Sequence, residues 1–171
     1  MTKLLLENWK RFITENTGDN IWYHTTSPQV AQQVIKTGLK INSNFNKSQM
    51  SQDYVRRIYG MNPIYISKEQ GLYKNGVVLS VDVSGMDLVV DIPTLISDYN
   101  AQLGEDYEHI WFEEDFTPFE MFDWIDGNGA LHFDDLLNPN SPVAKAMIEL
   151  TKTAAVMQDI PPDRIKIVGE V

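Results

Sequence analysis

The residues whose types and spacing could do chemistry begin at His24. This histidine is followed by three consecutive hydroxyl side chains at residues 25–27, and the run stops at Pro28, where a strand has to end. Residues 21–27 therefore predict a strand that ends in ligand-handling groups, because such groups lie where the backbone is rigid behind them and open in front. Two interpretations are open. His24 is a structural histidine at a strand end, whose hydrogen bonds are made within the protein, or it contacts a ligand.

A short helix is expected to follow this strand. Residues 29–37 place apolar side chains on one helical face, and Gly38 stands where a helix C-cap favours glycine. Thr26 and Ser27 suit the cap of this helix as well as they suit contact with a ligand. A second helix is predicted over residues 49–59.

Two further strands follow the helices. Residues 63–67 are rich in β-forming side chains, and Ser67 with Gln70 would suit a capping box for a helix or turn that begins there. Residues 76–84 are β-branched and almost continuously apolar, which predicts a central strand covered on both faces. Tyr23 and Asp82 are interpreted structurally, as a core aromatic and as a turn former at a strand end.

The rest of the chain predicts an α+β protein of one main domain. The proposed organisation is an amphipathic N-terminal helix at residues 1–16 and a domain at residues 21–171 that includes an acidic insertion at residues 104–140. The remaining elements are an extended piece at 87–91, helices at 92–103 and 142–152, and a strand, turn and strand over 153–168.

Length and composition limit the class of protein. The 171 residues are 43% hydrophobic, enough for one good core, and the chain holds no cysteine, which excludes disulfides, thiolate metal sites and cysteine nucleophiles. No apolar run approaches the ~18 residues of a membrane span, and charged residues interrupt the N-terminal apolar run that a secretory signal would need. The sequence therefore predicts a soluble, acidic protein with no membrane partner, expected in the cytoplasm.

The net charge of −10 is unevenly distributed. Residues 24–75 hold seven Lys or Arg against two acids, whereas residues 76–142 hold fifteen acids and no Lys or Arg. Either this is the uneven distribution of an ordinary acidic protein, or the segment that carries His24 faces an anion. Double-stranded DNA is not expected as a partner, because the overall charge repels the phosphate backbone.

The acidic segment also carries many aromatic side chains and two histidines, a mixture that can resemble a metal site. The segment lacks the spacing of a calcium loop, and His109 and His132 have no partner at metal-ligand spacing. We therefore expect no metal, and we interpret the aromatic side chains as the core of an insertion whose acids are solvated.

Three pieces together resemble the ADP-ribosyltransferase superfamily, in the branch of poly(ADP-ribose) polymerases, diphtheria-type toxins and RNA 2′-phosphotransferases. The first is residues 22–27 followed by a helix and residues 37–40, the second is residues 63–67 before the strand at 77–83, and the third is residues 160–165. The similarity covers about residues 21–92 and 153–168. It implies a split, mixed β-sheet with peripheral helices, and NAD as co-substrate in the cleft between the halves of the sheet.

The resemblance also implies roles for particular residues. His24 would match the motif histidine that hydrogen-bonds the adenosine ribose, and the backbone at Thr25 would hold the nicotinamide amide. Tyr65 would match the tyrosine that stacks on the nicotinamide ring, an aromatic face suited to a flat cation. Ser67 completes the expected cofactor-binding set.

The catalytic residues are not identified by the sequence. The family's glutamate opens a strand where Thr153 and Ala154 stand, and the nearest acids are Glu149 and Asp159. Glu113, Glu114 or Glu120 would have to fold back to replace it.

Three functional hypotheses follow. The first is an NAD-dependent transferase, a glycosyltransferase that passes ADP-ribose to a protein or RNA acceptor. The second is a catalytically degenerate binding or virion-associated module of the same fold. The third is an RNA 2′-phosphotransferase, for which three arginines are at hand: Arg56, Arg57 and Arg164.

The N-terminal residues 5–12 add one more resemblance, to the openings of tailed-bacteriophage proteins. It implies a phage protein that acts in the host cytoplasm or is carried in a virion.

Overall fold

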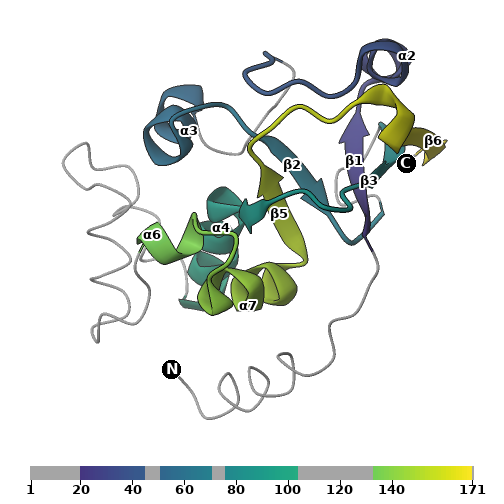
Figure 1. The fold of residues 1–171 in the computed structure, drawn as a ribbon. Coiled ribbons are helices and arrows are strands. Elements are labelled where there is room, and N and C mark those ends of the chain that lie inside the picture. The colour runs from purple at the N-terminus through teal and green to yellow at the C-terminus, as the bar shows by residue number, and fades with distance from the viewer. Residues whose placement is uncertain (1–19, 45–50, 71–75, 104–132, 171) are drawn as a thin grey trace. The chain divides into compact units, whose positions relative to one another are not determined.

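A computed structural model describes residues 20–44, 51–70, 76–103 and 133–170 (Figure 1). The helix expected at residues 1–16 and most of the acidic insertion lie outside the described residues. The described residues group into two compact units, one of residues 20–88 and 152–170 and the other of residues 89–103 and 133–151. Helices and strands both occur, so the chain is α+β.

The first unit is built on five strands: β1 (Ile21–Thr26), β2 (Ile64–Ser67), β3 (Val77–Asp82), β5 (Thr153–Val156) and β6 (Ile165–Glu170). They lie in the order β5, β2, β1, β3, β6. The four pairings between them are all antiparallel. The expectation of a mixed sheet is therefore not met in this unit. Strand direction depends on how the connecting segments return to the sheet, which the hydrophobic pattern of a strand does not encode.

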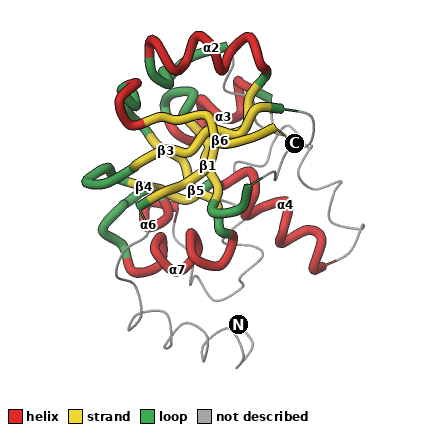
Figure 2. Tube along the Cα trace, turned by 90° about the vertical axis from the view of Figure 1, so that its right-hand side faces the viewer, coloured by secondary structure: helices red, strands yellow, loops and turns green. Residues whose placement is uncertain are grey.

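Helix α2 (Pro28–Thr37) follows β1 directly and lies beside β3 and β6 (Figure 2). Pro28 occupies the first turn, where its missing N–H costs nothing, and the hydroxyl of Ser27 accepts a hydrogen bond from the Val30 amide at 3.4 Å. Gly38 ends the helix with a φ of 81°. Of the two roles open to Ser27, the structure shows the helix cap.

Helix α3 (Gln52–Tyr59) is capped at both ends. The Ser51 hydroxyl accepts from the Tyr54 amide at 3.3 Å, and Gly60 takes the left-handed conformation, with a φ of 69°. The connection from α3 to β2 is fixed by Asn62, whose amide and side chain bond to the Asn42 side chain and to the Ser43 carbonyl, both at 2.9 Å. These contacts tie the segment before β2 to the segment that follows α2.

The core of this unit is apolar and centres on β3 and its neighbours. Gly38 is followed by Leu39, which pairs with Ile160 in an isolated antiparallel bridge, so the end of α2 is tied to the segment after β5. A short 3-10 turn, η3 (Pro162–Arg164), leads from there into β6. The fully buried side chains include Val55, Ile64, Val78, Leu79, Val81, Val156 and Ile160.

The sheet is nearly divided between β1 and β2. Among the described residues these two strands share a single register pair, Tyr23 with Ser67, whereas β1 and β3 share six pairs and β2 and β5 share four. The backbone ladder therefore joins β5 and β2 to β1, β3 and β6 at one point only.

The second unit contains β4 (Leu88–Val90) from its second residue on, together with α4 (Ile92–Leu103), α6 (Phe133–Leu136) and α7 (Pro142–Thr151). Asp91 caps α4, since its carboxylate accepts from the Thr94 amide at 3.0 Å and from the Thr94 hydroxyl at 2.8 Å. The Ser141 hydroxyl caps α7 in the same way. Helices α4 and α7 match their predicted ranges closely. No described helix of the chain has the length and apolar character needed to cross a bilayer.

Candidate functional site

A small pocket opens where β1 and β2 part. It measures about 240 Å³ when the solvent at its mouth is counted, less than the roughly 300 Å³ at which small-molecule sites begin. Its enclosed part has room for about one water molecule. The lining residues come from three adjacent strands: Tyr23, His24, Thr25, Tyr65, Ile66, Ser67 and Thr153.

All four residues expected to bind the cofactor line this one pocket: His24, Thr25, Tyr65 and Ser67. They come from β1 and β2, which are separated in sequence by two helices. The proximity arises from the antiparallel pairing of Tyr23 with Ser67, which brings the end of β2 to the middle of β1.

Three hydroxyl side chains form a row across the sheet. Tyr23 pairs with Ser67, and Ser67 in turn pairs with Thr153, so side chains from β1, β2 and β5 stand next to one another. Ser67 and Thr153 are buried, at 5% and 2% exposure. This hydroxyl row (Tyr23, Ser67 and Thr153) gives the pocket a polar, uncharged wall.

His24 bridges the two strands beside this row. Its Nδ1 lies 2.8 Å from the Tyr65 carbonyl oxygen. Because a carbonyl only accepts, Nδ1 carries the proton and donates it, which leaves Nε2 as the acceptor in the neutral ring. Burial lowers the pKa of His24 below its usual 6.5, and the bond to Tyr65 only partly offsets this effect, so the ring is neutral at physiological pH.

Tyr65 lies on β2 with its ring packed against α3. Its ring centroid is 6.4 Å from that of Tyr59, with the planes at 73°, an edge-to-face contact. Only 7% of Tyr65 is exposed. A ligand that stacks on this ring therefore requires the side chain to turn or the pocket to widen.

Tyr23 differs from its predicted structural role, and Ser67 takes part in a turn. The Ser67 hydroxyl donates to the Glu69 carbonyl at 2.6 Å, and residues 68–70 form bends and a turn, which is one of the two alternatives expected there; residues 71–73 lie outside the described residues. Tyr23 is half-buried and lines the pocket, where a core aromatic was expected. Asp82 matches its prediction, because its carboxylate accepts from the Ser84 amide at 2.9 Å and from the Ser84 hydroxyl.

No carboxylate stands among the described residues that line the pocket. Thr153, the first residue of β5, occupies the place where the family's glutamate was sought, and it offers a hydroxyl. Asp159 is engaged elsewhere, since it pairs with Lys40 at 3.0 Å and accepts from the Ile41 amide at 3.0 Å. Glu149 belongs to α7 in the second unit, and the three other glutamates considered lie outside the described residues.

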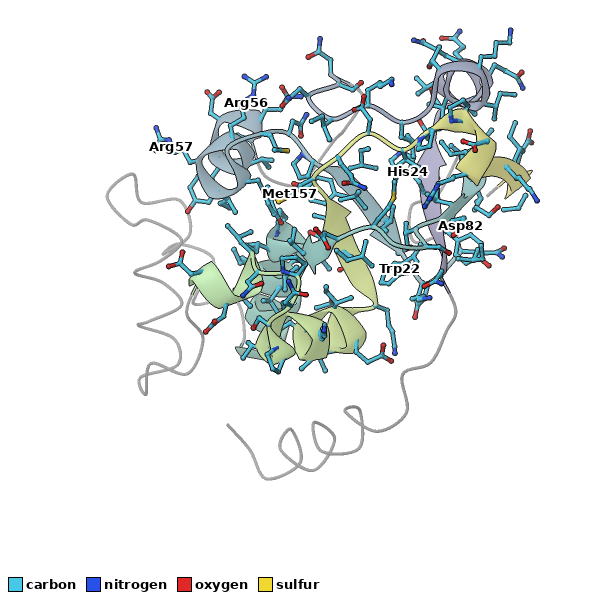
Figure 3. The ribbon with its side chains drawn as sticks, in the orientation of Figure 1. Trp22, His24, Arg56, Arg57, Asp82 and Met157 are labelled. Carbon is cyan, nitrogen blue, oxygen red and sulfur yellow. The ribbon has the colours of Figure 1, made fainter. Side chains whose placement is uncertain are left out.

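The arginines do not gather at the pocket. Arg56 and Arg57 are exposed on α3 and lie away from His24 (Figure 3). Arg164 donates to the Ser84 carbonyl at 2.6 Å and so holds the turn after β3. Within the described part of the chain, no three His, Asp or Glu side chains are grouped as a metal site would require.

Sequence reasoning missed two members of the site. Tyr23 was assigned to the core, and Ile66 was not singled out. The register between β1 and β2 decides both positions, and the only local signal was that these residues lie next to His24, Tyr65 and Ser67.

No protein-family model, curated protein or solved structure matches this chain. The function is therefore argued from the pocket and from the residues that line it.

Proposed function

We propose that this chain is an ADP-ribosyltransferase-like protein, which binds NAD where β1 and β2 part and transfers ADP-ribose to a protein or RNA acceptor. The observation that carries the proposal is the convergence of His24, Thr25, Tyr65 and Ser67 on one pocket. The near division of the sheet between β1 and β2 supports it, since the resemblance implied a split sheet with NAD between its halves.

The chemistry of the lining fits the uncharged polar groups of NAD, its ribose hydroxyls and its carboxamide. The acceptor Nε2 of His24 suits a ribose hydroxyl, because its tautomer is fixed by the bond to Tyr65. The hydroxyl row suits a carboxamide, which both donates and accepts hydrogen bonds. The Tyr65 ring would provide the stacking face once it turns away from its present buried position.

A second candidate is a degenerate module that binds NAD without transfer. Departure of nicotinamide leaves an oxocarbenium-like centre, which a carboxylate normally steadies through a ribose hydroxyl. Thr153 supplies no charge at the corresponding strand start, and this observation favours the degenerate reading. The RNA 2′-phosphotransferase alternative has less support, because the arginines it needs lie away from His24 or hold a turn.

The test is calorimetric titration of NAD into the wild type and into His24→Ala and Tyr65→Ala, with nicotinamide release followed in the same samples. We expect each variant to weaken binding about tenfold or more, the effect of losing one hydrogen bond or stacking contact. Thr26→Val is the matched control, since Thr26 lies on β1 but does not line the pocket. Equal binding by wild type and both variants, or no binding at all, would refute the NAD site.

Nicotinamide release separates the two candidates. Release by the wild type supports the transferase. Binding without release supports the degenerate module, and then Thr153→Glu, which adds a carboxylate at the strand start, is expected to produce release. Circular dichroism of each variant checks that the fold is retained.

A further inference from the structure

Lys68, the residue directly after β2, contacts the beginnings of two other strands. Its backbone amide donates to the Lys152 carbonyl at 2.8 Å, next to the start of β5. Its side-chain Nζ donates to the Ile21 carbonyl at 3.3 Å, at the start of β1. One residue thus connects β2 to both neighbours.

The side chain of Lys68 also lies over an aromatic ring. Its Nζ is 4.7 Å from the centroid of Trp22, which is 5% exposed. An ammonium over an indole face is attracted by the negative charge of the ring face, and the aliphatic stem covers apolar surface at the same time. The contact holds the Lys68 side chain against β1.

These contacts lie one residue away from the hydroxyl row. Lys68 follows Ser67, Trp22 precedes Tyr23, and Lys152 precedes Thr153. Along β1, His24 lies one residue after the Tyr23–Ser67 pair, whereas Trp22 and Ile21, which Lys68 contacts, lie before it. With a single register pair between β1 and β2, side-chain contacts on both sides of that pair set how far the strands part.

We propose that Lys68 is a positioning residue, whose amide and ammonium tie β5 and β1 to the end of β2 and so fix the spacing of the hydroxyl row and of His24. A looser tie lets the strands part further and admits water to the pocket. The inference concerns the geometry of the pocket, and it rests on the proposed function only for the identity of the ligand.

The test compares Lys68→Met, which keeps the length and loses the ammonium, with Lys68→Arg, which keeps a cation and a donor. The readout is the exchange of the His24 Nδ1 proton with water, measured by nuclear magnetic resonance, because local opening of the pocket sets this rate. We expect exchange about tenfold faster in Lys68→Met and near the wild-type rate in Lys68→Arg. Lys36→Met, at an exposed position of α2, is the matched control.

Two results would overturn the proposal: wild-type exchange in Lys68→Met, or equally fast exchange in Lys68→Met and Lys68→Arg. The wild type alone provides a second check, because protons on the Lys68 stem must show the upfield ring-current shift of a position over Trp22. Absence of that shift also overturns the proposal, whether or not a variant folds.

NAD titration of the same variants distinguishes this inference from the proposed function. If the wild type binds NAD, Lys68→Met is expected to bind several-fold more weakly and Lys68→Arg to bind as the wild type does. If the wild type binds none, the NAD site fails, while proton exchange at His24 still decides the role of Lys68.

Discussion

Replacing Gly38 by alanine tests the junction between α2 and the segment after β5. Gly38 has a φ of 81° and a ψ of 172°, a combination that residues with a Cβ rarely adopt. A Cβ built at this position would overlap the carbonyl oxygen of Ile160. The next residue, Leu39, exchanges two backbone hydrogen bonds with Ile160, both at 2.9 Å, so the bridge must shift to make room.

The expected loss of stability has two parts. The strained backbone conformation costs about 1–3 kcal/mol. Weakening of the two bridge hydrogen bonds adds roughly 0.5–1.5 kcal/mol for each bond. We therefore expect Gly38→Ala to lower the free energy of unfolding by about 2–6 kcal/mol.

Gly60→Ala is the matched control. Gly60 also has a positive φ, of 69°, but no heavy atom lies within 4 Å of an added Cβ. Its cost should be the left-handed conformation alone, about 1–2 kcal/mol. Urea unfolding followed by circular dichroism measures both variants, and equal losses in the two would refute the steric argument at Gly38.

Two further predictions concern pH and the turn after β3. Burial lowers the pKa of His24, so the unfolded chain takes up a proton at a higher pH than the folded chain does. The contribution of His24 to stability should therefore be complete above pH 6.5 and decline as the pH falls from 6.5 toward the pKa of the folded state. The measurement is the melting temperature of the wild type and of His24→Gln between pH 7.5 and 5, roughly one unit or more on each side of the usual histidine pKa. The two sets of melting temperatures should diverge on the acid side. Parallel curves would contradict this linkage. Arg164→Ala should cost about 1.5–3 kcal/mol, because the guanidinium donates to the Ser84 carbonyl at 2.6 Å. Urea unfolding measures the loss, and a change below about 0.5 kcal/mol would show that the contact contributes little to stability.

Local sequence signals predicted the elements well where a proline or glycine marked their ends. Pro28 and Gly38 bound α2 almost as expected, and β3 follows from its β-branched run. At Ser67 the sequence left a helix or a turn open, because both use the same hydroxyl and only the path of the following backbone decides between them. Short-range patterns therefore predicted where elements start more reliably than they predicted the contacts of the side chains at those ends.

The candidate site was predicted in part. The sequence identified four of its members, but not their arrangement, because the hydroxyl row depends on the register of three strands. Register is a property of pairing between distant segments, and nothing local to Tyr23 signals that it will face Ser67. The closed state of the pocket and the bond from His24 to the Tyr65 carbonyl likewise follow only from the packed structure.

The pairing of β2 with β5 has a consequence for how the protein folds. Ser67 meets Thr153 about 90 residues further along the chain, so this part of the sheet forms only after a long loop has closed. Strands β1 and β3 are separated by a shorter stretch and share the longer ladder, which makes them the natural nucleus. The wall that holds Thr153 would then be added late, and the pocket would be among the last features of the sheet to take shape during folding.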